Sequence, residues 1–464
     1  MDSAKWLKDG AEVEFAGADL GDARRSRRLQ QVAAQLSAEP AKSFPQTFGT
    51  AELEGFYRLL RNESVTWEAI LEPHLAATCE RAAQMAECLA IHDTTEFQFK
   101  GRDALCATSS SAKGFFGHFS LLVAMDAART PLGIGSLLQY ERKGRKKEAT
   151  RQEVIADPES EARRWYRSVE ALERRAAGKF SCIHVTDREG DMFEFLSNAV
   201  SLGARFVIRA TYDRRIVEDD ETTSLHEPLL RLKPSVARNI SISLRGNGLT
   251  PGMDRTHPPR GAREASIVMA ATTVSIISPH ELRTTSHEIE LNVVRVWEPK
   301  PPNGQPPVEW ILYTTEPVDT PEQIERVVDI YRARWTIEEF FKALKTGCSI
   351  EKRQLETFDT LTNAVAIFTP IAWRMLLARS VSRSTPDRPP TDVLTPVQIR
   401  ILELKLKRPL ASAKDALFAI ARLGGHLSQN GDPGWLTIGR GFEELLLAEF
   451  YFSLGQNAAR SDQS

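Results

Sequence analysis

Two segments of the chain carry apolar residues at alternate positions and end in an aspartate. They are Leu89-x-Ile91-x-Asp93 and Ile183-x-Val185-x-Asp187. Period-two alternation is typical of β-strands, and it places each aspartate on the side of the apolar residues before it. A carboxylate there is costly unless it is paired, binds metal or lies just beyond the strand end. An ordinary strand-end aspartate would explain either segment alone, whereas the two together favour a metal site.

The segments around these aspartates predict an α/β fold. Three successive strands are expected at CLAIHDTTEFQF (88–99), HFSLLVAMDA (118–127) and PLGIGSLLQYERK (131–143), with a tight turn at Thr130–Pro131. A polar helix is expected over about 149–176, then a strand at 181–187, a helix near 194–202 and a strand at 205–211. Three antiparallel strands followed by βα units match a ribonuclease-H-like core.

The segment YRARWTIEEFFKALK (331–345) predicts a helix with a polar row beside its apolar stripe. At about 100° per residue, Tyr331, Arg334, Glu338 and Lys345 fall within about 60° of one another. The apolar stripe lies about 90° away and consists of Ile330, Ile337, Phe340, Phe341 and Leu344. A carboxylate among cations suits phosphoryl transfer. A solvated face with an Arg334–Glu338 ion pair is the alternative.

Periodicity and composition predict three domains. Residues 1–67 are expected to be helical, with Leu29, Val32, Ala33 and Leu36 on one face. Residues 68–370 would form the α/β domain, with a β-rich insertion over about 212–315. Residues 371–464 would form a C-terminal helical domain, which includes a Pro- and Ser-rich segment at 382–392.

Composition narrows the possible classes of protein. The net charge of −2 does not itself indicate nucleic-acid binding, although a local basic patch remains possible. The five cysteines are scattered and include no CxxC pair, so zinc binding is not expected. Their odd number and wide spacing favour a reduced, cytoplasmic location. The first residues lack a signal-peptide core, and the apolar stretch 364–378 predicts a buried helix, so no membrane association is expected. No Walker A motif is present, so no nucleotide cofactor is expected.

The spacing Tyr331-x2-Arg334-x3-Glu338-x6-Lys345 resembles the YREK signature of the insertion-sequence-four family of bacterial DDE transposases. The resemblance covers nearly the whole chain. Its other motifs, in order, are LGDARRSRRL (20–29), FYRLLRN (56–62), LAIHDTT (89–95), VTDREGD (185–191), WILYTTEPV (310–318), RWTIEEFFKALKTG (334–347) and AIARLGG (419–425). Several spaced motifs in this order are more specific than any one of them.

This resemblance implies a role for each matched residue. Asp93, Asp187 and Glu338 would be the catalytic triad and would hold two Mg²⁺ or Mn²⁺ ions. The residues implied to contact DNA are Tyr331, Arg334, Lys345, Trp310, Arg28, Arg58 and Arg209. Four further residues would support the metal ligands: Thr94, Arg188, Glu189 and Asp191. Two alternatives remain open, namely a core position for Trp310 and a solvated helix face for the N-terminal arginines.

The resemblance also implies a reaction and partners. Water would nick one strand, the freed 3′-hydroxyl would form a hairpin, and the opened 3′ ends would join target DNA. The partners would be transposon terminal inverted repeats, target DNA and a second subunit in a homodimer. Residues 1–67 would bind the repeat, and the C-terminal helices would dimerise. The competing hypotheses are a transposase-derived DNA-binding protein without catalysis and an unrelated paired-carboxylate glycosidase.

Overall fold

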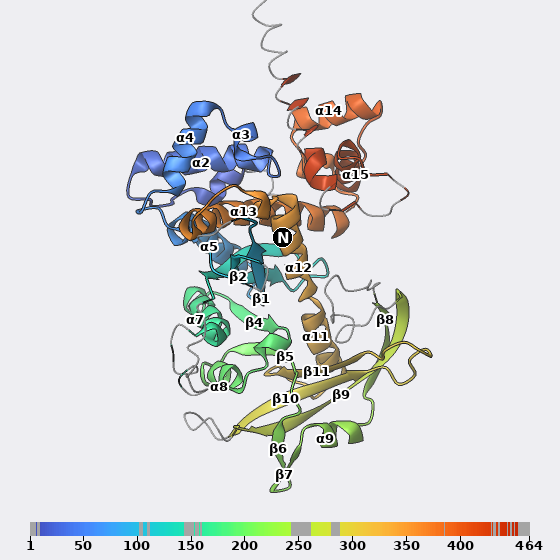
Figure 1. The fold of residues 1–464 in the computed structure, drawn as a ribbon. Coiled ribbons are helices and arrows are strands. Elements are labelled where there is room, and N and C mark those ends of the chain that lie inside the picture. The colour runs from blue at the N-terminus through green and yellow to red at the C-terminus, as the bar shows by residue number, and fades with distance from the viewer. Residues whose placement is uncertain are drawn as a thin grey trace, which may run out of the picture. The chain divides into compact units, whose positions relative to one another are not determined.

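The structure is a computed structural model of the 464-residue chain (Figure 1). It describes residues 6, 10–101, 105–108, 112–142, 153, 157, 160–242, 261–279, 288–384 and 386–427, and then 429, 433, 434, 437–442, 444, 445, 448, 449, 451 and 452. The chain divides into two compact units. The first comprises Met1–Arg145, Arg175–Ser181 and Trp335–Ser464, and the second comprises Lys146–Arg174 and Cys182–Arg334.

The first unit begins with helices, as the sequence predicts. In the described part these are η1 (Ala11–Phe15, a 3-10 helix), α2 (Ala23–Ala38), α3 (Phe44–Thr47), α4 (Thr50–Leu60) and α5 (Trp67–Ala83). Helix α2 starts where the Asp22 side chain accepts a hydrogen bond from the backbone N–H of Arg24. Its predicted inner face is buried, and so is that of α4. The helical prediction for this region is therefore confirmed.

Three antiparallel strands follow in the first unit. They are β1 (Glu87–Gln98), β2 (Gly114–Ala124) and β3 (Pro131–Tyr140), with β2 in the middle. Helix α5 packs closely on β3 at Gly133, which has φ +140° and where an added Cβ would lie 2.1 Å from Thr78 Oγ1. A side chain at this position would therefore push the strand away from the helix.

The described remainder of the first unit is mainly helical. It contains α12 (Trp335–Lys342), a π-helical turn (Ala343–Gly347), α13 (Phe358–Ser384), α14 (Pro396–Leu406) and α15 (Ala413–Leu423). Helix α13 has the length and apolar composition of a membrane span, but 89% of its apolar window is buried inside the protein. This burial favours the predicted core helix. The helix also runs without interruption through the predicted domain boundary at residue 370.

The second unit is a mixed sheet with helices on both faces. Its strands are β4 (Ser181–Thr186), β5 (Arg205–Arg209), β6 (Arg215–Glu218), β7 (Glu221–Ser224), β8 (Val236–Ile242), β9 (Arg263–Ile277), β10 (Glu288–Trp297) and β11 (Glu309–Thr314). Strands β4 and β5 are parallel, and the order continues β5-β11-β10-β9-β6-β7 through antiparallel pairs, with β8 beside β9. The expectation of a β-rich segment over about 212–315 is confirmed in its described part.

Helices cover the two faces of this sheet. One face packs against α7 (Arg164–Ala176) and α8 (Phe193–Ser201) through a core that includes Phe206, Ile208 and Tyr313. The other face packs against α11 (Pro321–Arg332). Helix α7 is shorter than the helix expected over 149–176, because a 3-10 turn that starts after Ser160 precedes it; most of the earlier positions lie outside the described residues.

Candidate active site

Asp93 lies within β1, half-buried, opposite Phe119 of β2. Its Oδ1 accepts a hydrogen bond of 2.8 Å from the backbone N–H of Thr94. Strand alternation puts Asp93 on the same face as Phe97, whose ring lies 6.4 Å from that of Phe119. The carboxylate is therefore held at a fixed place on an aromatic face of the strand pair.

Helix α12 packs on this same face and carries Glu338. The rings of Phe340 and Phe341 lie 5.4 and 5.7 Å from that of Phe119. Glu338 is half-buried at the start of this helix. Two of the three predicted carboxylates thus come from elements of the first unit that pack against each other.

The expectation of one continuous helix through 331–345 is wrong. Helix α11 ends at Arg332, and the backbone N–H of Arg334 bonds to the carbonyl of Tyr331, a 3-10 contact that closes the turn before α12. After Lys342 the helix widens into the π-helical turn, in which the N–H of Cys348 bonds to the carbonyl of Ala343. The angles of about 100° per residue that placed Tyr331 and Lys345 on one helix face with Glu338 therefore do not apply.

Lys345 lies in that π-helical turn and reaches β1. Its Nζ donates to the carbonyl of Glu96, lies 3.2 Å from Glu351 Oε1 and sits 5.5 Å from the centre of the Phe97 ring. Single π-helical turns often occur at functional sites. Here the turn directs a cation to the strand that bears Asp93.

Asp187 follows directly after β4 in the second unit. Its side chain caps a short 3-10 helix (Arg188–Gly190) by accepting a 2.8 Å hydrogen bond from the backbone N–H of Glu189. Because Thr186 is paired with Ile208, the next residue lies level with Arg209 of β5. Asp187 therefore lies directly beyond the strand end, and its role as a metal ligand stays a prediction.

Cations and aromatic rings gather around Asp187. Burial and then the charge of Arg209 lower the pKa of the Arg188 guanidinium, whereas Tyr331 and Asp187 raise it. Among the described residues, neither Arg188 nor Arg209 forms a salt bridge with a carboxylate. The Trp310 ring lies 5.7 Å from the Tyr331 ring. Two arginines held close together, neither of them in a salt bridge with any described residue, are suited to bind an anion such as phosphate.

Tyr331 and Trp310 are less exposed than a solvated polar face would require. Tyr331 is 7% exposed and Trp310 is half-buried. Trp310 is two residues from Leu312, so both side chains lie on the same face of β11, and Leu312 pairs with Arg209 of β5. This is the face that α11 covers, so Trp310 lies on the same side of the sheet as Tyr331. The structure therefore gives Trp310 a packing contact, which is the alternative that the sequence left open, and it leaves part of the indole accessible.

The residues expected to support the triad have clear partners. Thr94 Oγ1 lies 2.9 Å from His118 Nδ1, and the Glu189 carboxylate lies 2.8 Å from Arg164 Nη2. Asp191 is buried and binds Arg214. It also accepts hydrogen bonds from two backbone N–H groups that follow β5. Asp191 therefore fastens the segment after β5 to the loop that bears Asp187.

The two N-terminal arginines differ in their surroundings. Arg58 is exposed on α4. Arg28 of α2 is half-buried across Gly55 of α4, where an added Cβ would lie 2.9 Å from its Nη1. The absence of a side chain at Gly55 thus leaves room for the guanidinium between the two helices.

Sequence reasoning missed three residues near these positions. Trp335 is 53% exposed on α12, with Lys342 Nζ 5.3 Å from its ring centre. His118 and Arg214 are buried partners of residues named above. The tryptophan was detectable, since it is an aromatic residue directly after Arg334. The other two were not, because only the strand register and the loop geometry bring them to their partners.

The chemistry of the carboxylates fits a divalent cation. Half-buried aspartate and glutamate oxygens are ligands that Mg²⁺ and Mn²⁺ prefer. Asp93 and Glu338 belong to the first unit and Asp187 to the second. Among the residues that the structure describes, no group of three or more His, Cys, Asp or Glu side chains is gathered so that it could hold a metal ion. The donor types therefore fit, and assembly of the triad remains a prediction.

Comparison with known families gives two matches. A family model described as transposase DNA-binding matches residues 5–65, and one described as transposase DDE domain matches residues 138–369. The second match includes Asp187 and Glu338, begins after Asp93, and covers half of the 464 residues. The first match coincides with the N-terminal helices. The chain therefore belongs to the DDE transposases, and it is a DNA transposase with a DNA-binding domain and a DDE catalytic domain.

Proposed function

We propose that this transposase works by cut-and-paste transposition and belongs to the insertion-sequence-four group with the YREK signature. The observation that supports the catalytic part is that α12, the helix that bears Glu338, packs through Phe340 on Phe119, the residue that pairs with Asp93 across β1 and β2. Three antiparallel strands in one unit and a parallel β4-α8-β5 arrangement in the other support a ribonuclease-H-like core.

Asp93, Asp187 and Glu338 would hold two divalent ions, Mg²⁺ or Mn²⁺. When bound, such ions activate the attacking oxygen and stabilise the leaving oxygen of an in-line displacement. The chain's own hydrogen bonds orient two of the ligands, because backbone N–H groups fix one oxygen each of Asp93 and Asp187.

The basic and aromatic residues would position DNA. Arg188 and Arg209 would bind a phosphate beside Asp187, where their mutual repulsion is relieved by an anion. Lys345 and Arg334 would contact phosphates from the α12 side. Trp310 and the exposed Trp335 offer aromatic surface on which bases can stack.

The N-terminal helices would recognise terminal inverted repeats, with Arg28 and Arg58 as contacts. Target DNA would be the second nucleic-acid substrate, and the C-terminal helices would dimerise two subunits. We expect a cytoplasmic enzyme that uses neither a membrane nor a nucleotide cofactor, because transesterification conserves the energy of the phosphodiester bond.

The test is cleavage of supercoiled plasmid that carries the element's flanking terminal repeats, with Mg²⁺. Glu338→Gln is expected to lower excision at least about 100-fold, since it removes a metal ligand rather than a supporting residue. Binding to the repeats should be retained. Glu339→Gln is the matched control, because this neighbouring half-buried glutamate bonds to Lys342 and Arg379.

Two outcomes of this assay would contradict the proposal. Repeat binding without cleavage by the intact protein would indicate a DNA-binding protein that lacks catalysis. Equal cleavage by the intact protein and Glu338→Gln would show that Glu338 is not a metal ligand.

A further inference from the structure

Lys345, the proposed phosphate contact in the π-helical turn, is already paired with a carboxylate. Its Nζ lies 3.2 Å from Glu351 Oε1, and the two side chains are 28% and 31% exposed. Nζ also donates to the carbonyl of Glu96 in β1. The same Glu351 oxygen accepts a hydrogen bond of 3.1 Å from the backbone N–H of Gln98. A phosphate that approaches Lys345 therefore meets a negative charge that is already in place.

The lysine and the glutamate together complete one edge of β1. Glu96 and Gln98 are two positions apart, so their backbone polar groups face the same edge of the strand. Lys345 supplies a donor to that edge and Glu351 supplies an acceptor, as a neighbouring strand would. The ammonium is therefore held at a fixed place on β1, three positions beyond Asp93.

The loop that carries Glu351 is itself fixed, so the carboxylate cannot move away together with its backbone. Ile350, the residue before it, is 0% exposed, and Arg353, two positions after it, is 4% exposed. The Arg353 guanidinium lies 4.9 and 4.6 Å from two phenylalanine ring centres and donates to three backbone carbonyls. These partners are the rings of Phe44 and Phe368 and the carbonyls of Pro40, Lys42 and Cys348.

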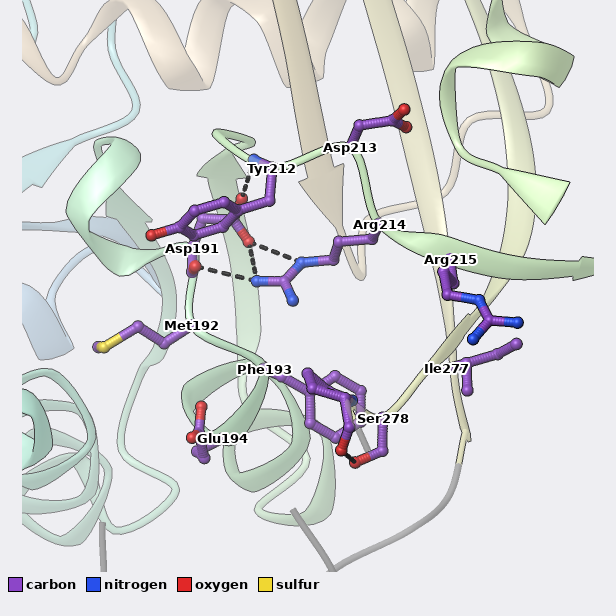
Figure 2. A pocket seen from close by; sticks show the side chains of 11 residues that line it. Asp191, Met192, Phe193, Glu194, Tyr212, Asp213, Arg214, Arg215, Ile277 and Ser278 are labelled. Atoms are coloured by element: carbon purple, nitrogen blue, oxygen red, sulfur yellow. Dashed lines mark hydrogen bonds and ion pairs between the residues drawn. The ribbon is translucent and has the colours of Figure 1, made fainter. Parts of the chain in front are cut away.

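Exposure decides whether a paired cation can exchange its carboxylate for a phosphate. Figure 2 shows Arg214 directed at Asp191, and the arginine side chain is only 8% exposed. DNA could reach that pair only by separating buried charges, which is costly. Lys345 is more than three times as exposed. Its ammonium group also has three rotatable donors, so one N–H can turn to a phosphate while another keeps its bond to Glu96.

A fixed carboxylate beside Lys345 opposes phosphate binding in two ways. It neutralises the lysine, so contact with DNA displaces fewer counterions. It also repels the phosphate, which would lie well within one Debye length. We propose that Glu351 is a positioning residue: it holds Lys345 against β1 and limits the strength with which this lysine binds a DNA phosphate. This proposal rests on the proposed function, in which Lys345 contacts DNA.

The experiment measures binding of a fluorescent duplex carrying the terminal repeat by the full-length chain, in EDTA and at several salt concentrations. Glu351→Gln removes the charge and keeps an amide oxygen that can accept from Gln98 and Lys345. The variant should bind about two- to fivefold more tightly, the size expected for one partly exposed ion pair. The logarithm of its binding constant should also fall more steeply with the logarithm of salt concentration, by about 0.9. A purely structural role for Glu351 would not steepen this salt dependence.

A double-mutant cycle tests whether the effect passes through Lys345. Lys345→Met removes the ammonium and should weaken binding on its own. Adding Glu351→Gln to Lys345→Met should then restore neither the affinity nor the salt dependence, since no cation remains to be released. Glu218→Gln is the matched control. Glu218 is 35% exposed and lies 2.6 Å from Arg231 in the second unit, so its substitution removes an equal charge and should leave binding unchanged.

The possible failures differ in what they overturn. Unchanged or weaker binding by Glu351→Gln, an unchanged salt dependence, or the same gain in the Lys345→Met background would refute the role of Glu351 while the transposase function stands. Failure of the unsubstituted chain to bind any repeat-containing duplex would refute this proposal together with the proposed function.

Discussion

Glu14 provides the sharpest test of what holds the first unit together. It is 6% exposed in η1 and is bound by two residues of α5. Arg81 donates from Nη1 and Nη2 to its two oxygens at 2.9 and 3.2 Å, and His74 Nδ1 lies 2.5 Å from Oε2. Arg81 Nε also donates to the Leu132 carbonyl in β3. This network joins the N-terminal helices to the first strands, within one unit.

The structure gives a magnitude for Glu14→Gln. Burial raises the pKa of Glu14, but His74 and Arg81 outweigh it and bring the pKa from 4.5 to about 2. That difference corresponds to about 3 kcal/mol of unfolding free energy at neutral pH. The substitution also leaves Arg81 buried beside a neutral amide, a change that costs about 3–5 kcal/mol when a buried pair is broken. We expect a loss of about 3 kcal/mol, since the amide oxygen retains one acceptor.

The same network determines the pH dependence of stability. A carboxyl whose folded pKa is lowered contributes stability above its unfolded pKa, and this is lost between pH of about 4.5 and 2. Burial lowers the pKa of His74, whose Nε2 accepts from the Ile134 N–H, so the neutral ring is the folded form. The contribution of neutral His74 to stability is complete above the unfolded pKa of about 6.5 and falls as the pH drops below that value. Stability should therefore decline in acid, first through His74 and then through Glu14.

The assay is urea unfolding at pH 7, followed by tryptophan fluorescence, since the Arg81 guanidinium lies 4.2 Å from the Trp373 ring centre. Glu12→Gln is the matched control, because Glu12 lies in the same short helix and is only half-buried. The control should change the unfolding free energy by less than about 0.5 kcal/mol. A loss below about 1 kcal/mol for Glu14→Gln, or equal losses for both variants, would refute the reasoning.

Three further predictions concern the active site. Arg209→Ala should weaken DNA binding and reduce the steepness with which the logarithm of the binding constant falls with the logarithm of salt concentration, by about 0.9. A salt titration measures this slope, and an unchanged slope would mean that Arg209 contacts no phosphate. Trp310→Ala should preserve first-strand nicking and slow hairpin formation, because loss of a stacked base would raise the barrier of that step by about 1–3 kcal/mol. A denaturing gel separates the two products; equal loss of both steps would indicate that the indole only packs on Tyr331. Chelation by EDTA should abolish cleavage and leave repeat binding intact, with activity restored by Mn²⁺ or Mg²⁺; cleavage that persists in EDTA would contradict a carboxylate-bound metal.

The local elements of the fold were largely predictable from the sequence. Strands β1 and β3 begin within one residue of their expected starts, because their apolar runs are bounded by polar residues and a proline. The inner faces of α2 and α4 follow directly from helical periodicity. The motif residues around Asp93, Asp187 and Glu338 were equally visible, since each lies in a short stretch with its own pattern.

The sequence did not reveal the break between α11 and α12 or the π-helical turn at Lys345. Neither position carries a proline, and the apolar stripe continues through both, so a single helix was the simplest interpretation. The break coincides with the boundary between the two units at Arg334 and Trp335. Helix α11 packs on β5, β9 and β10, whereas α12 packs on β1 and β2, and this packing overrides the local helical preference there.

Periodicity and motif spacing alone thus determined most of the elements, the candidate carboxylates and the chemistry they suit, because these depend on residues close together in the chain. Tertiary structure decided which side chains meet. Glu14 with Arg81 and Asp191 with Arg214 are paired across 67 and 23 positions of the chain. Such pairs leave no periodic signal, because they form only when burial makes an unpaired charge too costly to tolerate.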